Sequence, residues 1–239
     1  CARAGARAGE GHLSMSDVAV IGGTGHQGLG LVLRWAAAGL DVVIGSRDEG
    51  RAQNAAESAR ARLAGIKPDA RVGGAVNAAA AAAAPIVVLC VPLAAQAETL
   101  RGIKEHLPDD ALLVDVTVPL AASLGIRGGR LLGLPAGSAA EQAAELVPPA
   151  SRVVAAFHLL AAEALQDLEH EVDCDAIVCG EKSARERVRP LAESIPGVRY
   201  VDGGPLYNAH LVEACAGLVI GMNGRYKVQR AGLRITGLP

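Results

Sequence analysis

The stretch that decides the fold runs from Val18 to Gly28 and reads VAVIGGTGHQG. It is a short apolar run, as in a buried strand, followed by a cluster of glycines. The segment after it carries apolar side chains at helical spacing, at Leu29, Val32, Leu33 and Ala36. A glycine-rich turn between a strand and a helix is typical of a dinucleotide site, where backbone N–H groups at the helix N-terminus bind the diphosphate. The alternative is a turn that only packs the helix against the sheet.

The spacing of the glycines leaves their individual roles open. Gly23, Gly25 and Gly28 fit the pattern GxGxxG, and a second phase that begins at Gly22 fits equally well. One glycine is expected to allow the tight turn, one to let the diphosphate approach the backbone, and Gly28 to let the helix pack on the strand.

Short apolar runs alternate with helical segments along the rest of the chain. The expected strands cover residues 18–21, 42–44, 86–91, 112–114, 153–157, 176–179 and 198–201. The expected helices cover residues 27–38, 52–63 and 183–194, and a closing helix carries Leu211, Ala214, Cys215, Leu218 and Met222 on one stripe. This alternation predicts an α/β protein with a Rossmann-type doubly wound parallel sheet and a smaller C-terminal α/β domain. Ligands would bind at the carboxyl ends of the strands.

Composition argues against several classes of function. A formal net charge of -2 and an aromatic content of 2% give little basis for nucleic-acid binding. The sequence has no uninterrupted apolar window long enough for a membrane span. The five cysteines and six histidines form no CxxC or HExxH pattern, so we expect reduced thiols, no metal site and a cytoplasmic protein.

Residues after the second expected strand indicate which dinucleotide binds. An NAD-dependent enzyme would place an acidic residue there, on the ribose hydroxyls, whereas this chain has Ser46 and Arg47, with Arg51 one helical turn further on. Guanidinium groups suit a 2′-phosphate, so the sequence favours NADP(H). Alternatively, both arginines are solvated helix charges, and Asp48 caps the helix or pairs with Arg51.

Several motifs together resemble the family of F420-dependent NADP reductases. They are VAVIGGTGHQGLG, VVIGSRDEGRA, VLCVPL, VVAAFHLLAA, VCGE, DGGPLYNAHLVE and AGLRITGLP. The resemblance runs from near Met15 to the C-terminus. It implies a two-domain enzyme, usually a homo-oligomer, that passes a hydride between NADP(H) and the deazaflavin coenzyme F420.

The resemblance also implies a set of site residues. The diphosphate turn comprises Gly22, Gly23, Thr24, Gly25, His26, Gln27 and Gly28. The 2′-phosphate would be held by Thr24, Ser46, Arg47 and Arg51, and the nicotinamide would lie near Val91, Pro92 and Leu93. The deazaflavin pocket would be lined by His158, Leu160 and Ala162 and closed by Gly204, Pro205, Leu206 and Tyr207. Tyr207 departs from the smaller polar residue expected there.

These expectations divide the chain into three parts. Residues 1–14 have no apolar pattern and are expected to form a disordered tail. Residues 15–150 would form the NADP-binding Rossmann domain, and residues 151–239 a smaller domain that completes the deazaflavin pocket. The boundary is placed after a segment, residues 119–149, that is rich in Gly, Ala and Pro.

His158 is the candidate catalytic residue. It follows the expected strand 153–157, so its imidazole would reach the ligand crevice and could hydrogen-bond a ring carbonyl or donate a proton. The alternative is a histidine bonded to the backbone at the end of a strand. Two other functions remain open: an NADPH-dependent reductase of a small imine or carbonyl compound with His158 as the acid, and a non-catalytic NADP(H)-binding sensor.

Overall fold

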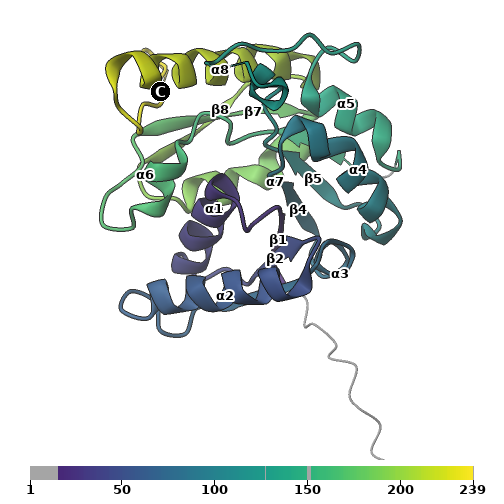
Figure 1. Ribbon diagram of the computed structural model, residues 1–239, viewed down its shortest axis with the longest axis vertical. Helices are drawn as coiled ribbons and strands as arrows, with labels where there is room; N and C mark the ends of the chain where they lie inside the picture. The colour runs from purple at the N-terminus through teal and green to yellow at the C-terminus, as the bar shows by residue number, and fades with distance from the viewer. Residues whose placement is uncertain (1–15, 127, 150–151, 239) are drawn as a thin grey trace, which may run out of the picture.

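The computed structural model describes residues 16–126, 128–149 and 152–238. Within these residues eight strands form one sheet in the order β3-β2-β1-β4-β5-β6-β7-β8 (Figure 1). The strands are β1 (Val18–Ile21), β2 (Val42–Ser46), β3 (Val72–Val76), β4 (Ile86–Leu89), β5 (Leu112–Asp115), β6 (Arg152–Ala155), β7 (Cys174–Gly180) and β8 (Val198–Asp202). Neighbouring strands are parallel except β6 and β7, which are antiparallel. The prediction of a Rossmann-type α/β sheet is confirmed.

Helices cover both faces of the sheet. They are α1 (His26–Ala37), α2 (Glu49–Leu63), α3 (Asn77–Ala82), α4 (Leu93–Ile103), α5 (Ala139–Leu146), α6 (Ala162–Gln166), α7 (Lys182–Glu193) and α8 (Ala209–Tyr226), with short 3₁₀ turns η1 (Lys104–His106), η2 (Ala121–Leu124) and η3 (Leu206–Asn208). Alternate side chains of β1 point to opposite faces. Val18 and Val20 pack in the cluster that includes α1, α2 and α7, and Ala19 and Ile21 pack in the cluster that includes α3, α4 and α5.

The buried face of the closing helix, α8, is not the one that the sequence pattern predicted. The stripe predicted for it faces outward, since Leu211, Leu218 and Met222 are 54%, 65% and 43% exposed. The buried face of α8 instead carries Val212 and smaller residues such as Ala216. Periodicity could not choose between these two faces, because both have helical spacing.

The sheet continues across the predicted domain boundary. β6 begins at Arg152 and pairs in register with β5, and β7 then pairs with β6. The division into residues 15–150 and 151–239 stays a prediction, and the tail predicted for residues 1–14 lies outside the described residues. In the part of the chain that the structure describes, no helix is both long and apolar enough to cross a membrane.

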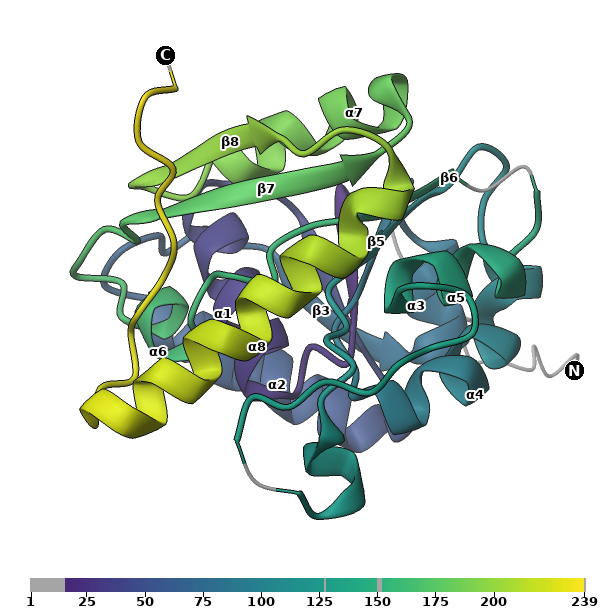
Figure 2. The same ribbon diagram turned by 90° about the horizontal axis from the view of Figure 1, so that it is seen from above.

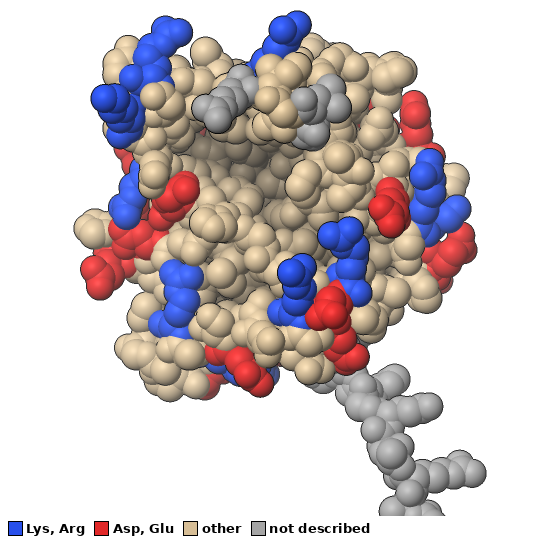
Figure 3. Space-filling model, in the orientation of Figure 1, with Lys and Arg blue, Asp and Glu red and all other residues tan. Residues whose placement is uncertain are grey.

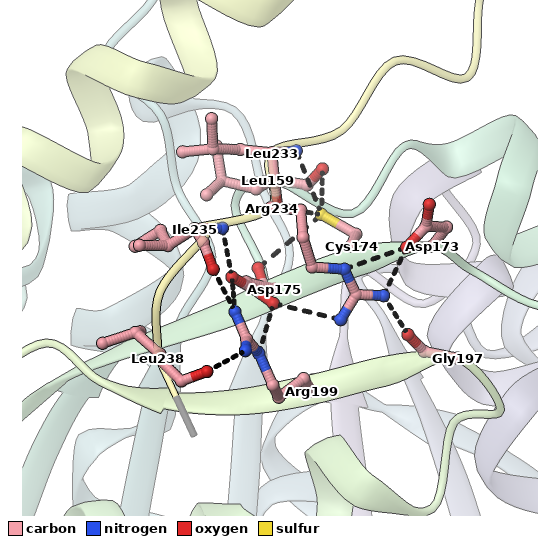
Figure 4. Close-up of polar contacts among 10 residues, drawn as sticks. All are labelled: Leu159, Asp173, Cys174, Asp175, Gly197, Arg199, Leu233, Arg234, Ile235 and Leu238. Carbon is pink, nitrogen blue, oxygen red and sulfur yellow. Dashed lines mark hydrogen bonds and ion pairs between the residues drawn. The ribbon is translucent and has the colours of Figure 1, made fainter.

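The C-terminal segment crosses β7 and β8 and is fastened there by a buried carboxylate (Figures 2 and 4). The side chain of Asp175 on β7 is fully buried, and it accepts two hydrogen bonds from Arg199 on β8, at 3.0 and 2.8 Å. It also accepts hydrogen bonds from Arg234 Nη1 at 3.2 Å and from the backbone N–H of Ile235 at 2.7 Å. Burial alone would raise the pKa of Asp175, but these donors lower it below its usual value. The segment is therefore an integral part of the fold.

Candidate functional site

The glycine turn after β1 is shaped by two close approaches. Gly22 has a φ of +81°, and a Cβ there would lie 2.3 Å from the carbonyl oxygen of Cys90. A Cβ on Gly28 would lie 2.7 Å from the carbonyl oxygen of Gly22. Gly25 forms the N-cap of α1, and its Cβ would meet only the Gly22 oxygen, at 3.3 Å. Gly22 thus makes the tight turn, Gly28 packs α1 against it, and Gly25 stands where the backbone is open to a ligand.

A polar cavity of about 200 Å³ lies beside this turn. It brings together residues from the two connections, after β1 and after β2, that the sequence had assigned to the NADP phosphates, namely Gly22, Thr24, Gly25, Ser46, Arg47 and Arg51, and adds Asp48 and Asn77. Asp48 caps α2 by accepting a hydrogen bond from the backbone N–H of Arg51 at 2.7 Å. Among the ion pairs of the described residues, none involves Arg47 or Arg51. Both guanidinium groups are therefore available to an anion.

An apolar slot of about 520 Å³ adjoins the polar cavity. One wall is formed by residues predicted near the nicotinamide, Val91, Pro92 and Leu93, and another by Gly25, His26, Gln27 and Gly28. The slot is also lined by Val116, Val118, Leu120 and Ala122, which sequence reasoning missed. A hollow with uncharged walls opens on the face drawn in Figure 3. Because Gly25, Val91 and Pro92 line both spaces, a dinucleotide can run from the polar cavity into the slot.

A buried polar network lies behind the slot and was also missed. Asp115, at the carboxyl end of β5, is fully buried. It accepts hydrogen bonds from the backbone N–H and hydroxyl of Thr117, at 3.1 and 2.6 Å, and from Gln96 Nε2 on α4 at 2.8 Å. Burial raises the pKa of Asp115 to about 7. The network shapes the turn that carries two slot residues, Val116 and Val118.

His158 lies in a different place from the slot-lining residues. It lines a cavity of about 220 Å³ together with Gln27, Leu160 and Ala162 and with residues of α8. The residue is 9% exposed, and neither ring nitrogen has a hydrogen-bond partner among the described residues. Burial lowers the pKa of His158 to about 4, although the backbone of Thr117 acts in the opposite direction. The imidazole is neutral at pH 7, so it can form one hydrogen bond as donor and one as acceptor.

Residues 204–207 line none of these three cavities. The carbonyl oxygen of Gly204 accepts hydrogen bonds from the N–H of Gly180 at 2.9 Å and from Arg185 Nη1 at 3.0 Å. Tyr207 is 61% exposed, and Pro205 and Leu206 lie between Gly204 and α8. That these residues close the deazaflavin pocket stays a prediction.

Metal-binding and thiol chemistry have few candidate residues. Among the described residues, no group of three or more His, Cys, Asp or Glu side chains could hold a metal ion. The described cysteines, Cys90, Cys174, Cys179 and Cys215, are free. Burial raises the pKa of Cys90 and raises that of Cys179 to about 11, so both stay protonated at neutral pH.

Comparisons with known proteins agree with the resemblance found in the motifs. Residues 17–119 match the family model described as NADP oxidoreductase coenzyme F420-dependent. The F420-dependent NADP reductase of Methanothermobacter thermautotrophicus is 46% identical over 93% of this chain and 95% of its own length. The enzyme of the same name from Methanocaldococcus jannaschii is 39% identical over 92% of this chain and 98% of its own length.

Solved structures add a match at the level of the fold. A crystal structure from Arthrobacter, described as an F420-dependent NADP-reductase, aligns with a TM-score of 0.74 at 25% identity and covers 92% of this chain and 99% of its own. A reductive aminase from Aspergillus terreus aligns with a TM-score of 0.59 at 15% identity, which shows a shared fold alone. Since relatives at 39% and 46% identity extend over more than nine-tenths of the chain, this protein belongs to the family of F420-dependent NADP reductases.

Proposed function

We propose that this protein transfers a hydride between NADP(H) and the deazaflavin coenzyme F420. The observation that carries the proposal is an apolar slot that adjoins a polar cavity containing Arg47 and Arg51, neither of which forms an ion pair with the described residues. When bound, NADPH supplies the hydride and F420 accepts it, or the reverse. Direct transfer requires two rings held together in a space without water, and it needs no protein nucleophile.

The polar cavity would bind the phosphates of NADP(H). N–H groups in the first turn of α1 are not used within the helix, and together with the helix dipole they favour the diphosphate. Arg47 and Arg51 would bind the 2′-phosphate, with Ser46 and Thr24 as further donors. β2 ends at Ser46 and is followed by Arg47, where an NAD-dependent enzyme would have an acidic residue. This supports a preference for NADP(H) over NAD(H).

The slot would hold the nicotinamide against the deazaflavin. Val91, Pro92, Val116 and Val118 give the slot an apolar lining, which would exclude water from between the rings. His158, Leu160 and Ala162 would line the outer part of the deazaflavin site. Since the His158 imidazole is neutral, we assign it a hydrogen bond to a ring carbonyl rather than the donation of an extra proton.

An absorbance assay tests the proposal. Purified protein should oxidise NADPH only when F420 is added, and EDTA should have no effect. Deuteride at C4 of the nicotinamide should appear at C5 of the deazaflavin without exchange into solvent. Turnover of NADPH with a small imine or carbonyl compound and none with F420 would instead indicate the imine or carbonyl reductase. Tight NADPH binding with no acceptor at all would indicate a sensor.

We also propose that the protein acts as a homo-oligomer in the cytoplasm. The outward stripe of α8 exposes Leu211, Leu218 and Met222 on one helix, an apolar surface that a second copy could bury. Free cysteines are typical of a reducing compartment. Light scattering should give a mass above that of one chain, and Leu218→Glu should lower it. A monomeric wild-type protein would contradict the proposal.

A further inference from the structure

The turn that carries His158 has an unusual backbone. Phe157 has a φ of +66°, in the left-handed region that non-glycine residues seldom adopt, and it is followed by a hydrogen bond from the N–H of Leu160 to the Phe157 oxygen. Such a conformation persists only where the surroundings fix it. The Phe157 ring packs edge-on against Trp35 of α1, with ring centroids 5.5 Å apart.

The side chain of Gln27 fixes this turn from α1. Its Nε2 atom donates hydrogen bonds to the carbonyl oxygens of Phe157, at 3.2 Å, and Leu160, at 2.9 Å. Both hydrogens of the amide are therefore used on a segment about 130 residues away in sequence. The motif had placed Gln27 among the cofactor-binding residues, but its side-chain donors are not free for a cofactor.

The residues that follow this turn, including α6, also pack on α1. Leu165 of α6 packs so closely on α1 that a Cβ at Gly30 would lie 2.6 Å from the Leu165 Cβ. The buried side chain of Arg34 donates to the carbonyl oxygens of Ala164, at 2.8 Å, and Leu165, at 2.9 Å. Figures 1 and 2 show α6 lying beside α1. These contacts fasten α6, whereas the turn before it depends on Gln27.

Gln27 lies at both parts of the site, the slot and the cavity that contains His158. Its backbone is in the first turn of α1, where the diphosphate would bind, and its residue lines both the slot and the cavity that contains His158. We infer that Gln27 is a positioning residue for hydride transfer, which holds the turn Phe157–Leu160 and His158 at a fixed place relative to bound NADP(H). The inference rests on the proposed function and adds a residue to it.

Three variants test the inference in the full-length protein. Gln27→Met keeps the length of the side chain and removes both donors, and Gln27→Glu places a carboxylate against two carbonyl oxygens. Gln53→Met is the matched control, because the amide of Gln53 is exposed on α2 and donates a hydrogen bond to Glu49 of the same helix. For each protein we would measure the Kd for NADPH, kcat and KM for F420, and hydrogen exchange of residues 157–165.

Gln27→Met should lower kcat/KM for F420 about tenfold, the scale of two lost hydrogen bonds, with NADPH affinity within about twofold of wild type. Exchange in residues 157–165 should become faster, and the emission of Trp35, the only tryptophan, should shift because Phe157 moves. Gln27→Glu should lower kcat/KM for F420 and speed exchange more strongly, and its carboxylate, in the first turn of α1, should also weaken NADPH binding. Gln53→Met should show none of these changes.

Two results would overturn the inference. One is a Gln27→Met protein with wild-type F420 kinetics and wild-type exchange at residues 157–165. The other is an equal loss of affinity for NADPH and F420 with unchanged exchange, which would make Gln27 a direct cofactor contact. If the wild-type protein itself does not turn over F420, the proposed function fails. The exchange and Trp35 measurements then still decide whether Gln27 holds the turn.

Discussion

Mild acid should destabilise this protein through His158. The imidazole is buried and its pKa is lowered from 6.5 to about 4, whereas in the unfolded chain it regains the ordinary value. As the pH falls through 6.5, His158 therefore becomes protonated in the unfolded chain but stays neutral in the folded protein. The stability that depends on neutral His158 is complete above pH 6.5 and is lost progressively down to about pH 4. The two pKa values correspond to a loss of about 2 kcal/mol at pH 5 and about 3 kcal/mol at pH 4.

Urea unfolding of the wild type and of His158→Gln between pH 8 and pH 5 measures this loss. Glutamine stays neutral, so the variant should lack this component, and wild type should lose about 2 kcal/mol relative to the variant over that range. The buried carboxyls of Asp115 and Glu213 change the free energy of unfolding with pH in the opposite direction. Burial raises their pKa values to about 7 and about 6, so their contribution is largest in acid and is lost as the pH rises. Both proteins contain these carboxyls, so their effect cancels in the difference.

A constant difference between the two proteins, within about 0.5 kcal/mol from pH 8 to pH 5, would refute this reasoning. It would mean that His158 keeps an ordinary pKa in the folded protein, as an imidazole that reaches solvent does. A histidine that keeps an ordinary pKa could also donate a proton during turnover, so the same result would reopen the assignment of His158 as an acid.

Three further substitutions address the cofactor site and the C-terminal segment. Arg47→Ala should weaken NADPH binding by about 1–3 kcal/mol and leave NADH binding nearly unchanged, as measured by titration calorimetry; equal weakening of both would argue against a 2′-phosphate contact. Gly28→Ala should lower the free energy of unfolding by about 1–3 kcal/mol and weaken NADPH binding, because its Cβ would lie 2.7 Å from the Gly22 oxygen; wild-type melting and affinity would show that the turn can open. Asp175→Asn should cost about 2–4 kcal/mol in urea unfolding, since Arg199 loses a buried partner; a cost below about 0.5 kcal/mol would mean that the C-terminal segment is held by other contacts.

Local signals predicted the first strand, turn and helix well. β1, the glycine turn and α1 are specified by a continuous stretch of chain, and six of the residues assigned to the phosphates line one cavity. β3 was missed because Val72–Val76 contains two glycines, which weaken a strand pattern. α3 was missed because its alanine-rich sequence has no apolar period to recognise.

Other features of the site depend on contacts between distant parts of the chain. The slot residues Val118 and Leu120 lie in the irregular segment between β5 and the short turn η2, where neither helical nor strand periodicity applies. The role of Gln27 was hidden for a similar reason, because its partners are about 130 residues away. The inward face of α8 is set by Gly217, where a Cβ would lie 2.6 Å from the oxygen of Gly129. None of these contacts between distant residues can be inferred from a sequence pattern.

The buried carboxylate of Asp175 has a consequence for how the chain folds during synthesis. Its partners Arg234 and Ile235 are translated about 60 residues after it, so the ribosome must complete nearly the whole described chain before they are available. Until then the buried carboxylate on β7 has the guanidinium of Arg199 but lacks the donors from Arg234 and Ile235. β1 to β5, which pair with one another, can form as they emerge, whereas β7 and β8 reach their final stability only near the end of translation.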